Sequence, residues 1–176
     1  MPAHRHPEGV GSPGPDFATF YATAWPRLLR TTYAVAGDRQ LAEDALQAAL
    51  AKAYAAWPRV SRAGDPFAYV RRIAINAALA QHRKAHRRRE TTVDRLPDRP
   101  APTVADPLER DSVLRAVRSL PPRQRAVVVL RYYEDLTEQQ IADVLGCRPG
   151  TVKSQASAAL ASLRTSLADL PEGDPR

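Results

Sequence analysis

The stretch Leu136–Leu160, LTEQQIADVLGCRPGTVKSQASAAL, constrains the fold more than any other part of the chain. Thr137, with Gln140 three residues later, predicts a capping box, in which the two side chains bond to free backbone N–H groups at a helix start. Gly146 permits a tight turn, and Pro149 suits the first turn of a following helix. A generic helical hairpin does not need all three signals in register, so the stretch predicts a helix-turn-helix.

The second helix of this motif combines an apolar stripe with a polar start. Its apolar residues recur at i, i+4, i+8 and i+11 and are Val152, Ala156, Leu160 and Leu163. The polar positions at or just before its N-terminal end are Arg148, Thr151, Lys153, Ser154 and Gln155. In a helix-turn-helix such positions enter the major groove of DNA, where Gln can read adenine and Lys or Ser can meet phosphates or guanine edges.

Proline-rich segments divide the chain into two helical blocks. Residues 16–90 and 108–170 carry helical patterns without strand-like alternation, and each block can just support its own core. Between them, residues 91–107 are rich in Pro and Asp and predict a flexible linker. Residues 1–15 and 171–176 predict a disordered leader and a disordered tail. The predicted fold is all-α, with two small helical domains joined by a flexible linker.

The first block is expected to contain three main helices. Asp16 is expected to cap the first, Pro26 to bend it, and Gly37 to end it. The inward stripe of the second is expected to be Leu46, Leu50, Ala53, Tyr54 and Trp57. The third is expected to start at Asp65 and Pro66, with a buried face made of Phe67, Val70, Ile73, Ala74 and Ala77.

A cationic run, HRKAHRRR, ends the third helix at His82–Arg89. Cations at a helix C-terminus interact favourably with the helix dipole, but that explains one or two of them, not five cations and two histidines. The run therefore favours contact with phosphates. A solvated helix end and a membrane-surface helix are the alternatives, although the run lacks the Trp or Phe of a membrane-surface helix.

The overall composition indicates an anionic partner. The 176 residues carry a formal net charge of +7, which favours nucleic acid or a membrane surface, unless it reflects the arginine-rich composition of a high-GC genome. The single Cys147 excludes an internal disulfide and has no metal-ligand spacing around it. We find no membrane-length apolar run and no signal-peptide pattern, so a cytoplasmic protein is expected.

Enzymatic chemistry has little support in this sequence. No nucleophile–base pair, metal cluster or Gly-rich phosphate loop can be assembled. The best polar set, His82, His86 and Glu90, lies at a cationic helix end, which leaves a nuclease as the least favoured class. We expect no catalytic residues, no metal, no cofactor and no small-molecule substrate.

Three longer segments resemble a known family. LPPRQRAVVVLRYYEDLTEQQIADVLGCRPGTVKSQASAALASLR resembles sigma region 4 of extracytoplasmic-function RNA polymerase sigma factors. DRQLAEDALQAALAKAYAAW resembles the polymerase-binding helix of sigma region 2, and FAYVRRIAINAALAQHRKAHRRR resembles the segment that melts and reads the minus-ten element. The resemblance covers residues 16 to 168 and is greatest to the small actinobacterial sigma-E family.

This resemblance implies a transcription initiation factor that binds core RNA polymerase and promoter DNA and makes no covalent bond itself. The residues implied to face the polymerase lie on one side of the second helix and are Asp44, Gln47, Ala48 and Ala51. Those implied to meet the minus-ten strand are Arg71, Arg72, Asn76, Arg83, Lys84, Arg87 and Arg88. The start of the last helix would read the minus-thirty-five element, and an anti-sigma factor is the expected regulator.

The chain departs from the family pattern at five positions. Ala48 and Leu50 replace a common acidic residue and a common aromatic, which implies an altered contact with polymerase. Ala80 stands where Asp is frequent, so minus-ten specificity does not carry over. Gln155 and Ala158 replace usual arginines, and losing two phosphate contacts predicts weak autonomous DNA binding with a flatter salt dependence.

A free-standing helix-turn-helix regulator is the main alternative function. Such a regulator would bind operators without polymerase, which would leave the Asp44 and Gln47 face and the linker without a role. It would also be expected to carry a ligand-binding or dimerisation domain. These points favour the sigma-factor interpretation.

Overall fold

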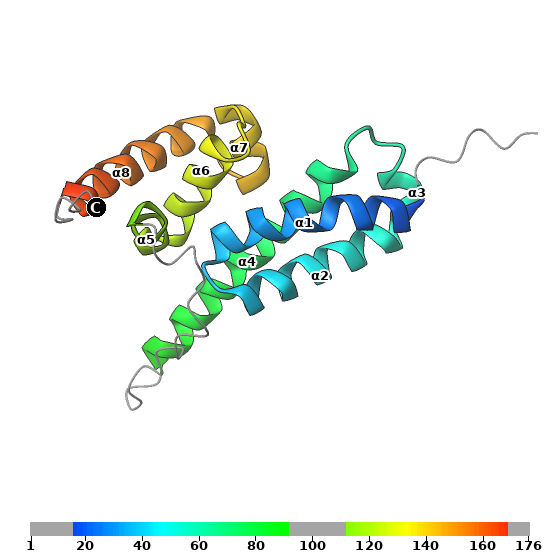
Figure 1. Ribbon diagram of the computed structural model, residues 1–176, viewed down its shortest axis with the longest axis horizontal. Coiled ribbons are helices and arrows are strands. Elements are labelled where there is room, and N and C mark those ends of the chain that lie inside the picture. The colour runs from blue at the N-terminus through cyan, green and yellow to red at the C-terminus, as the bar shows by residue number, and fades with distance from the viewer. Residues whose placement is uncertain (1–15, 92–111, 169–176) are drawn as a thin grey trace, which may run out of the picture.

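The computed structural model of the protein describes residues 16–91 and 112–168, all of it helical apart from short turns and loops (Figure 1). The N-terminal domain contains α1 (Phe17–Ala36), α2 (Arg39–Ala55), α3 (Trp57–Val60) and α4 (Pro66–Thr91). The C-terminal domain contains α5 (Ser112–Ser119), α6 (Pro122–Tyr132), α7 (Glu138–Leu145) and α8 (Pro149–Ala168). The all-α prediction with two helical domains is confirmed for these residues. The predicted leader, most of the predicted linker and the predicted tail lie outside them.

Capping residues define the helix ends of the N-terminal domain. Gly37 ends α1 with a φ of 73°, and its N–H donates to the Tyr33 carbonyl. Asp38 then begins α2 by accepting from the Leu41 amide at 2.8 Å, and Asp65 accepts from the Ala68 amide at 2.9 Å at the start of α4. Asp16 does not cap α1 with its side chain, so that prediction is wrong.

The core of the N-terminal domain lies between α1, α2 and α4, which run side by side (Figure 1). Its fully or nearly fully buried members include Leu28, Leu46, Leu50 and Val70. The predicted stripe of α2 is wrong at its C-terminal end. There the Tyr54 side chain is exposed, and Trp57 belongs to the separate short helix α3.

The α4 helix is buried on two sides rather than on one. Val70 and Ala74 are buried as predicted, whereas Phe67, Ile73 and Ala77 are only half-buried. The completely or almost completely buried residues that were not predicted are Ile75, Ala78 and Leu79. Ile75 and Leu79 are covered by side chains of the C-terminal domain, whereas Ala78 packs against α1 and α2 within the N-terminal domain.

The helix-turn-helix has the predicted local geometry. Thr137 accepts from the Gln140 amide at 3.2 Å while Gln140 accepts from the Thr137 amide at 2.9 Å, which completes the capping box. Gly146 ends α7 with a φ of 62°, in the left-handed region that glycine adopts at little cost. Val152 and Ala156 then bury one face of α8.

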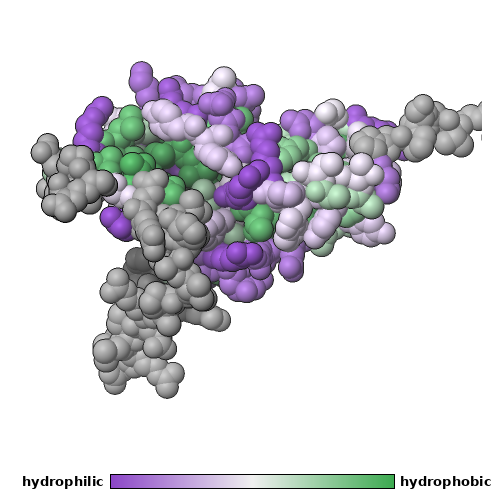
Figure 2. Space-filling view, in the orientation of Figure 1, coloured by the Kyte–Doolittle hydropathy of each residue, from purple (hydrophilic) through white to green (hydrophobic). Residues whose placement is uncertain are grey.

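A single hydrophobic cluster joins the two domains. It combines Val35, Ile75 and Leu79 of the N-terminal domain with the buried side chains of α6, α7 and α8, among them Leu130 and Ile141. Separate cores had been expected, so the arrangement differs from the prediction in this respect. A smaller cluster lies between α5, α6 and α8, and Figure 2 shows hydrophobic side chains gathered over that part of the molecule.

Candidate polymerase-binding and DNA-binding surfaces

The predicted polymerase-binding residues form one exposed face of α2. All four are exposed, and they recur at i, i+3, i+4 and i+7: Asp44, Gln47, Ala48 and Ala51. Gln40 donates to the Asp44 carboxylate at 2.9 Å, which orients that carboxylate along the helix. The face therefore carries small side chains at its centre and polar side chains toward its N-terminal end.

An apolar groove of about 260 Å³ lies beside this face, between α1 and α2. Gln47 and Ala51 form one side of the groove, and Phe17 and Tyr54 form part of the rest. Tyr54 is 66% exposed and Tyr21 is 41% exposed, and the rings of Phe17 and Tyr54 lie 5.0 Å apart in an edge-on arrangement. Tyr54 was predicted to lie on the inward stripe of this helix, although the exposed side of α2 continues through Tyr54 at i+7 from Gln47.

The residues predicted to meet the minus-ten strand do not share one environment. Arg72, Arg83, Lys84 and Arg87 are exposed along α4. Arg88 lies within α4, but its side chain is outside the described residues. The remaining two predicted residues, Arg71 and Asn76, contact the C-terminal domain.

Arg71 and Asn76 both bond to the C-terminal domain. Arg71 is only 8% exposed, and its guanidinium donates to the Glu134 carboxylate at 3.1 Å. The Asn76 amide donates to the Val144 carbonyl at 2.7 Å and to the Arg72 carbonyl at 2.8 Å. Arg71 is therefore closed to a nucleic acid strand in this arrangement, whereas Asn76 is half-buried and its NH2 group is engaged.

Glu134 connects the two domains from the turn between α6 and α7. Its side chain has no accessible surface, and its carboxylate accepts from Arg27 at 2.8 Å, from Arg71 at 3.1 Å and from the Thr31 hydroxyl. All three donors belong to the N-terminal domain. Glu134 was not predicted from the sequence, because a Glu in a polar turn carries no local signal of burial.

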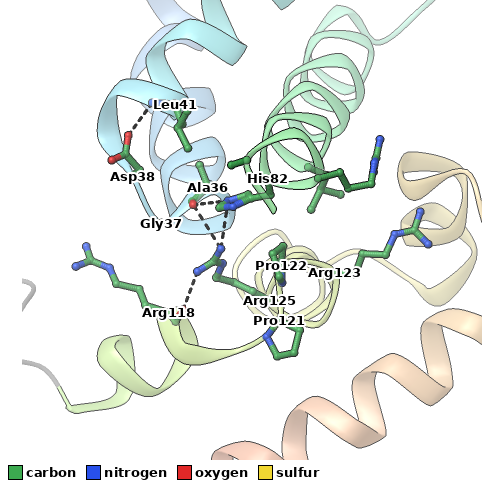
Figure 3. A pocket seen from close by; sticks show the side chains of 13 residues that line it. Ala36, Gly37, Asp38, Leu41, His82, Arg118, Pro121, Pro122, Arg123 and Arg125 are labelled. Carbon is green, nitrogen blue, oxygen red and sulfur yellow. Dashed lines mark hydrogen bonds between the residues drawn. The ribbon is translucent and has the colours of Figure 1, made fainter. Parts of the chain in front are cut away.

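A second interdomain contact forms where α1 ends (Figure 3). Arg125 of α6 donates to the Val35 carbonyl at 2.8 Å and to the Arg118 carbonyl at 2.7 Å. Burial lowers the pKa of Arg125, and the nearby charge of Arg118 acts in the same direction. A Cβ added at Gly37 would lie 2.8 Å from the Arg125 guanidinium, so glycine leaves room for this contact as well as for the turn.

His82 belongs to this contact rather than to a free cationic run. Its Nε2 lies 2.7 Å from the Ala36 carbonyl and 3.4 Å from an Arg125 nitrogen (Figure 3). Burial lowers the pKa of His82, and the Arg125 charge also lowers it. A groove of about 680 Å³ opens beside these side chains, with Arg83 from α4 and Arg123 from α6 on its rim.

The predicted major-groove residues lie at the start of α8. Arg148, Lys153 and Ser154 are exposed, whereas Thr151 and Gln155 are half-buried. Ser154 donates to the Thr151 carbonyl at 3.0 Å, a bond within the helix that leaves its oxygen free to accept another. Together these residues give α8 an exposed polar end with two cations.

Among the described residues, no cluster of three or more His, Cys, Asp or Glu could hold a metal ion. None of the described helices combines the length and hydropathy that a bilayer span requires.

Known proteins share both domains of this chain. The families Sigma-70 region 2 and Sigma-70, region 4 match residues 20–88 and 110–163. The RNA polymerase sigma-E factor of Streptomyces antibioticus is 36% identical over 153 residues, which cover 86% of this chain and 84% of the relative. The ECF RNA polymerase sigma factor SigL of Mycobacterium tuberculosis is 32% identical over 157 residues, which cover 85% of each chain.

A solved structure has the same fold. The sigma factor RpoE of Bartonella quintana, in a crystal with the anti-sigma factor NepR, superimposes with a TM-score of 0.66 at 24% identity. The match covers 89% of this chain and 99% of that one. Because both domains are matched in this order and over most of its length, the chain belongs to the sigma-70 family of RNA polymerase sigma factors.

Proposed function

We propose that this sigma factor binds core RNA polymerase through the exposed face of α2 and directs initiation at promoters with minus-ten and minus-thirty-five elements. The observation that carries the proposal is the contiguous exposed face formed by Asp44, Gln47, Ala48 and Ala51. Small side chains at its centre allow a partner helix to approach the α2 backbone closely. The adjoining apolar groove would take an apolar side chain of that partner.

The two DNA elements would be met by different domains. The exposed cations of α4 would track the backbone of the melted minus-ten strand, with Asn76 and Arg71 joining them when they are freed. The start of α8 would enter the major groove of the minus-thirty-five element, where Lys153 and Arg148 supply charge and Gln155 can read adenine. The polymerase, not this chain, would catalyse bond formation, so the chain itself is proposed to be no enzyme.

Location and regulation follow from these partners. The chain is proposed to act in the cytoplasm, where core polymerase and promoter DNA are found. An anti-sigma factor is a proposed further partner, as in the crystal of the Bartonella quintana relative.

Run-off transcription tests the proposal. Purified protein is combined with Streptomyces core RNA polymerase and a fragmented genomic template, and the transcript start sites are mapped. Shared upstream elements at minus ten and minus thirty-five are expected, and the absence of directed initiation would reject the sigma-factor function in favour of a free-standing regulator.

A charge insertion tests the α2 face. Ala51→Arg places a long side chain in the proposed contact and should abolish co-elution with core polymerase. Ala22→Arg is the matched control, because Ala22 is an exposed alanine of α1 that lies outside that face. Equal polymerase binding by both variants would show that the interface does not include this face of α2.

A further inference from the structure

We propose that Glu134 latches an autoinhibited state of this protein, in which the C-terminal domain covers part of the minus-ten surface until the domains separate. The proposal deepens the proposed function, since the covered side chains are those assigned to minus-ten binding. It rests on the buried carboxylate, on the side chains that it holds, and on the shared hydrophobic cluster.

The C-terminal domain holds the Glu134 carboxylate in a fixed position. The Glu134 amide donates to the Val129 carbonyl at 3.2 Å, and the Leu136 amide donates to the Leu130 carbonyl at 3.0 Å. Between them, Asp135 has a φ of 52°, in the left-handed region that Asp tolerates better than most residues. The turn thus aims Glu134 out of its own domain and toward the N-terminal one.

Among the described residues, the side chains that donate to the Glu134 carboxylate all come from the other domain. Arg27 and Thr31 come from α1, and Arg71 comes from α4. A carboxylate without accessible surface is stable only when it is paired and hydrogen-bonded, because burial removes its hydration. Closure is therefore specific: another placement of the domains would leave Glu134 buried without partners or Arg71 without its counter-ion.

Opening the latch would leave no buried charge behind. When the domains separate, Glu134, Arg27 and Arg71 regain water, which offsets much of the lost ion pairing. The larger cost is exposure of Val35, Ile75 and Leu79, which the C-terminal domain covers in the shared cluster. Such an interface is strong enough to persist in the free protein and can still yield to a partner that binds the open form more tightly.

Closure removes two of the proposed minus-ten side chains from use. Arg71 is neutralised by Glu134, and the Asn76 amide is held by the Val144 carbonyl. Arg72 and Arg83 stay exposed. The closed form therefore keeps part of the positive charge of the minus-ten surface but loses the contacts that Arg71 and Asn76 would make. The free protein would then bind melted promoter DNA weakly until it meets polymerase.

Thiol labelling can measure latch opening even when the open form is rare. In a Cys147→Ala background, Leu79→Cys places a thiol in the interdomain cluster, and Ala49→Cys places one in the core of the N-terminal domain. Glu134→Gln keeps the shape of the side chain but removes the charge. It should speed labelling at position 79 on the order of 100-fold, because it leaves Arg71 buried without a counter-ion.

Two further variants calibrate this measurement. Arg27→Gln removes a donor whose side chain is 55% exposed, so it should speed labelling at position 79 only about threefold. Arg131→Gln removes an ion pair of similar length that lies within the C-terminal domain, and it should leave the labelling rate unchanged. Neither residue belongs to the proposed DNA or polymerase surfaces.

The position of the second thiol decides between a latch and a general loss of stability. If Glu134→Gln speeds labelling at position 79 while position 49 is unaffected, the domains separate as proposed. Equal acceleration at both positions would mean that Glu134 only supports the fold, and no acceleration at either would mean that it does not hold the domains together. Both of those outcomes overturn the proposal.

Binding of single-stranded DNA measures whether closure masks the minus-ten surface. Binding of a fluorescein-labelled single strand of twenty thymidines to the free protein should tighten at least about threefold in Glu134→Gln, because Arg71 becomes available to phosphates. Unchanged binding, despite faster labelling, would overturn the autoinhibition. In the Leu79→Cys protein that keeps Glu134, core polymerase should speed labelling at position 79. If that protein does not bind polymerase at all, the result counts against the proposed function and not against the latch.

Discussion

At the scale of single residues, Arg125 shows how the fold uses a buried cation. It is 5% exposed, and its guanidinium donates to the Val35 carbonyl at 2.8 Å and reaches the Ala36 carbonyl at 3.4 Å. These carbonyls lie in the last turn of α1, where carbonyls lack a partner within the helix. The negative end of the α1 dipole also favours a cation there. One side chain of the C-terminal domain therefore completes a helix of the N-terminal domain.

Replacing Arg125 should be costly. Arg125→Met keeps the apolar stem but leaves buried carbonyls unsatisfied, and it should lower the free energy of unfolding by about 2 kcal/mol. Arg123→Met is the control, because Arg123 is an exposed arginine of the same helix. Urea denaturation followed by circular dichroism measures both, and equal stability of the two variants would contradict the role given to Arg125.

His82 should make stability depend on pH. Its pKa is lowered in the folded state, so below about pH 6.5 the unfolded chain takes up protons at this site more readily than the folded one. The stabilisation is fully present above the unfolded pKa and is lost as the pH falls through the folded pKa. Urea midpoints at pH 7.5 and pH 5.5 should therefore differ less in His82→Gln than in the unaltered protein. An identical pH dependence in both would show that His82 does not titrate differently on folding.

At the scale of helices, α7 and α8 owe their geometry to local signals. The capping box starts α7, Gly146 ends it, and the stripe begun by Val152 and Ala156 packs α8 onto its neighbours. These signals act within a few residues, which is why the sequence predicts them. The α4 helix behaves differently, because a helix with two buried sides does not show one simple apolar stripe.

Removing the N-terminal cap of α7 should lower the stability of the C-terminal domain. Thr137→Ala deletes the side-chain acceptor for the Gln140 amide and should lower the free energy of unfolding by about 1 kcal/mol. Ser157→Ala, at an exposed interior position of α8, should change it by less than about 0.5 kcal/mol. Thermal or urea denaturation separates these values, and a neutral Thr137→Ala would show that other contacts define the start of α7.

Adding charge to the exposed side of α8 should strengthen DNA binding by the polymerase complex. Ala158→Arg restores a cation that the family usually carries, so the logarithm of the binding constant for promoter duplex should fall more steeply with salt, by about one unit of slope. Ala22→Arg adds the same charge to exposed α1 and should leave the slope unchanged. Fluorescence anisotropy over a salt series tests this, and equal slopes would place position 158 away from the phosphates.

At the scale of the whole molecule, the two domains share one core in this conformation. The cluster that contains Val35 and Leu79 also contains Leu130 and Ile141, so the C-terminal domain completes its packing on the N-terminal one. The expected weakness of DNA binding by the C-terminal domain alone thus has a second cause, besides the missing arginines at 155 and 158. Removed from its partner, that domain would expose part of its core to water.

A shared core predicts a single cooperative unfolding transition. Trp25 and Trp57 both lie in the N-terminal domain, so tryptophan fluorescence reports that domain, whereas far-ultraviolet circular dichroism reports the helices of both. The two signals should change together over a urea series. Separate midpoints would mean that the domains unfold independently and that the interface adds little stability.

The sequence by itself determined the main helices, most of their caps and the helix-turn-helix, and the resemblance added the order of the two domains. It also placed the exposed faces of α2 and α8, since periods of three and four residues assign faces from local spacing alone. It misplaced Tyr54, because an aromatic residue at a helix end satisfies the core pattern whether or not another element covers it. It also treated Arg71, Asn76 and His82 as open to DNA.

Only the tertiary structure decided which charged side chains are buried at the domain boundary. Glu134 meets Arg71 across 63 residues of sequence and Arg27 across 107, and no local period encodes pairs so far apart. A turn glutamate and a helix arginine are each ordinary surface residues by composition, and Glu134 and Arg71 become buried only when the two domains close over them. Local hydrogen bonding and periodicity act within a few residues, whereas burial of charge depends on what packs against it, and that is why the latch is visible in the structure alone.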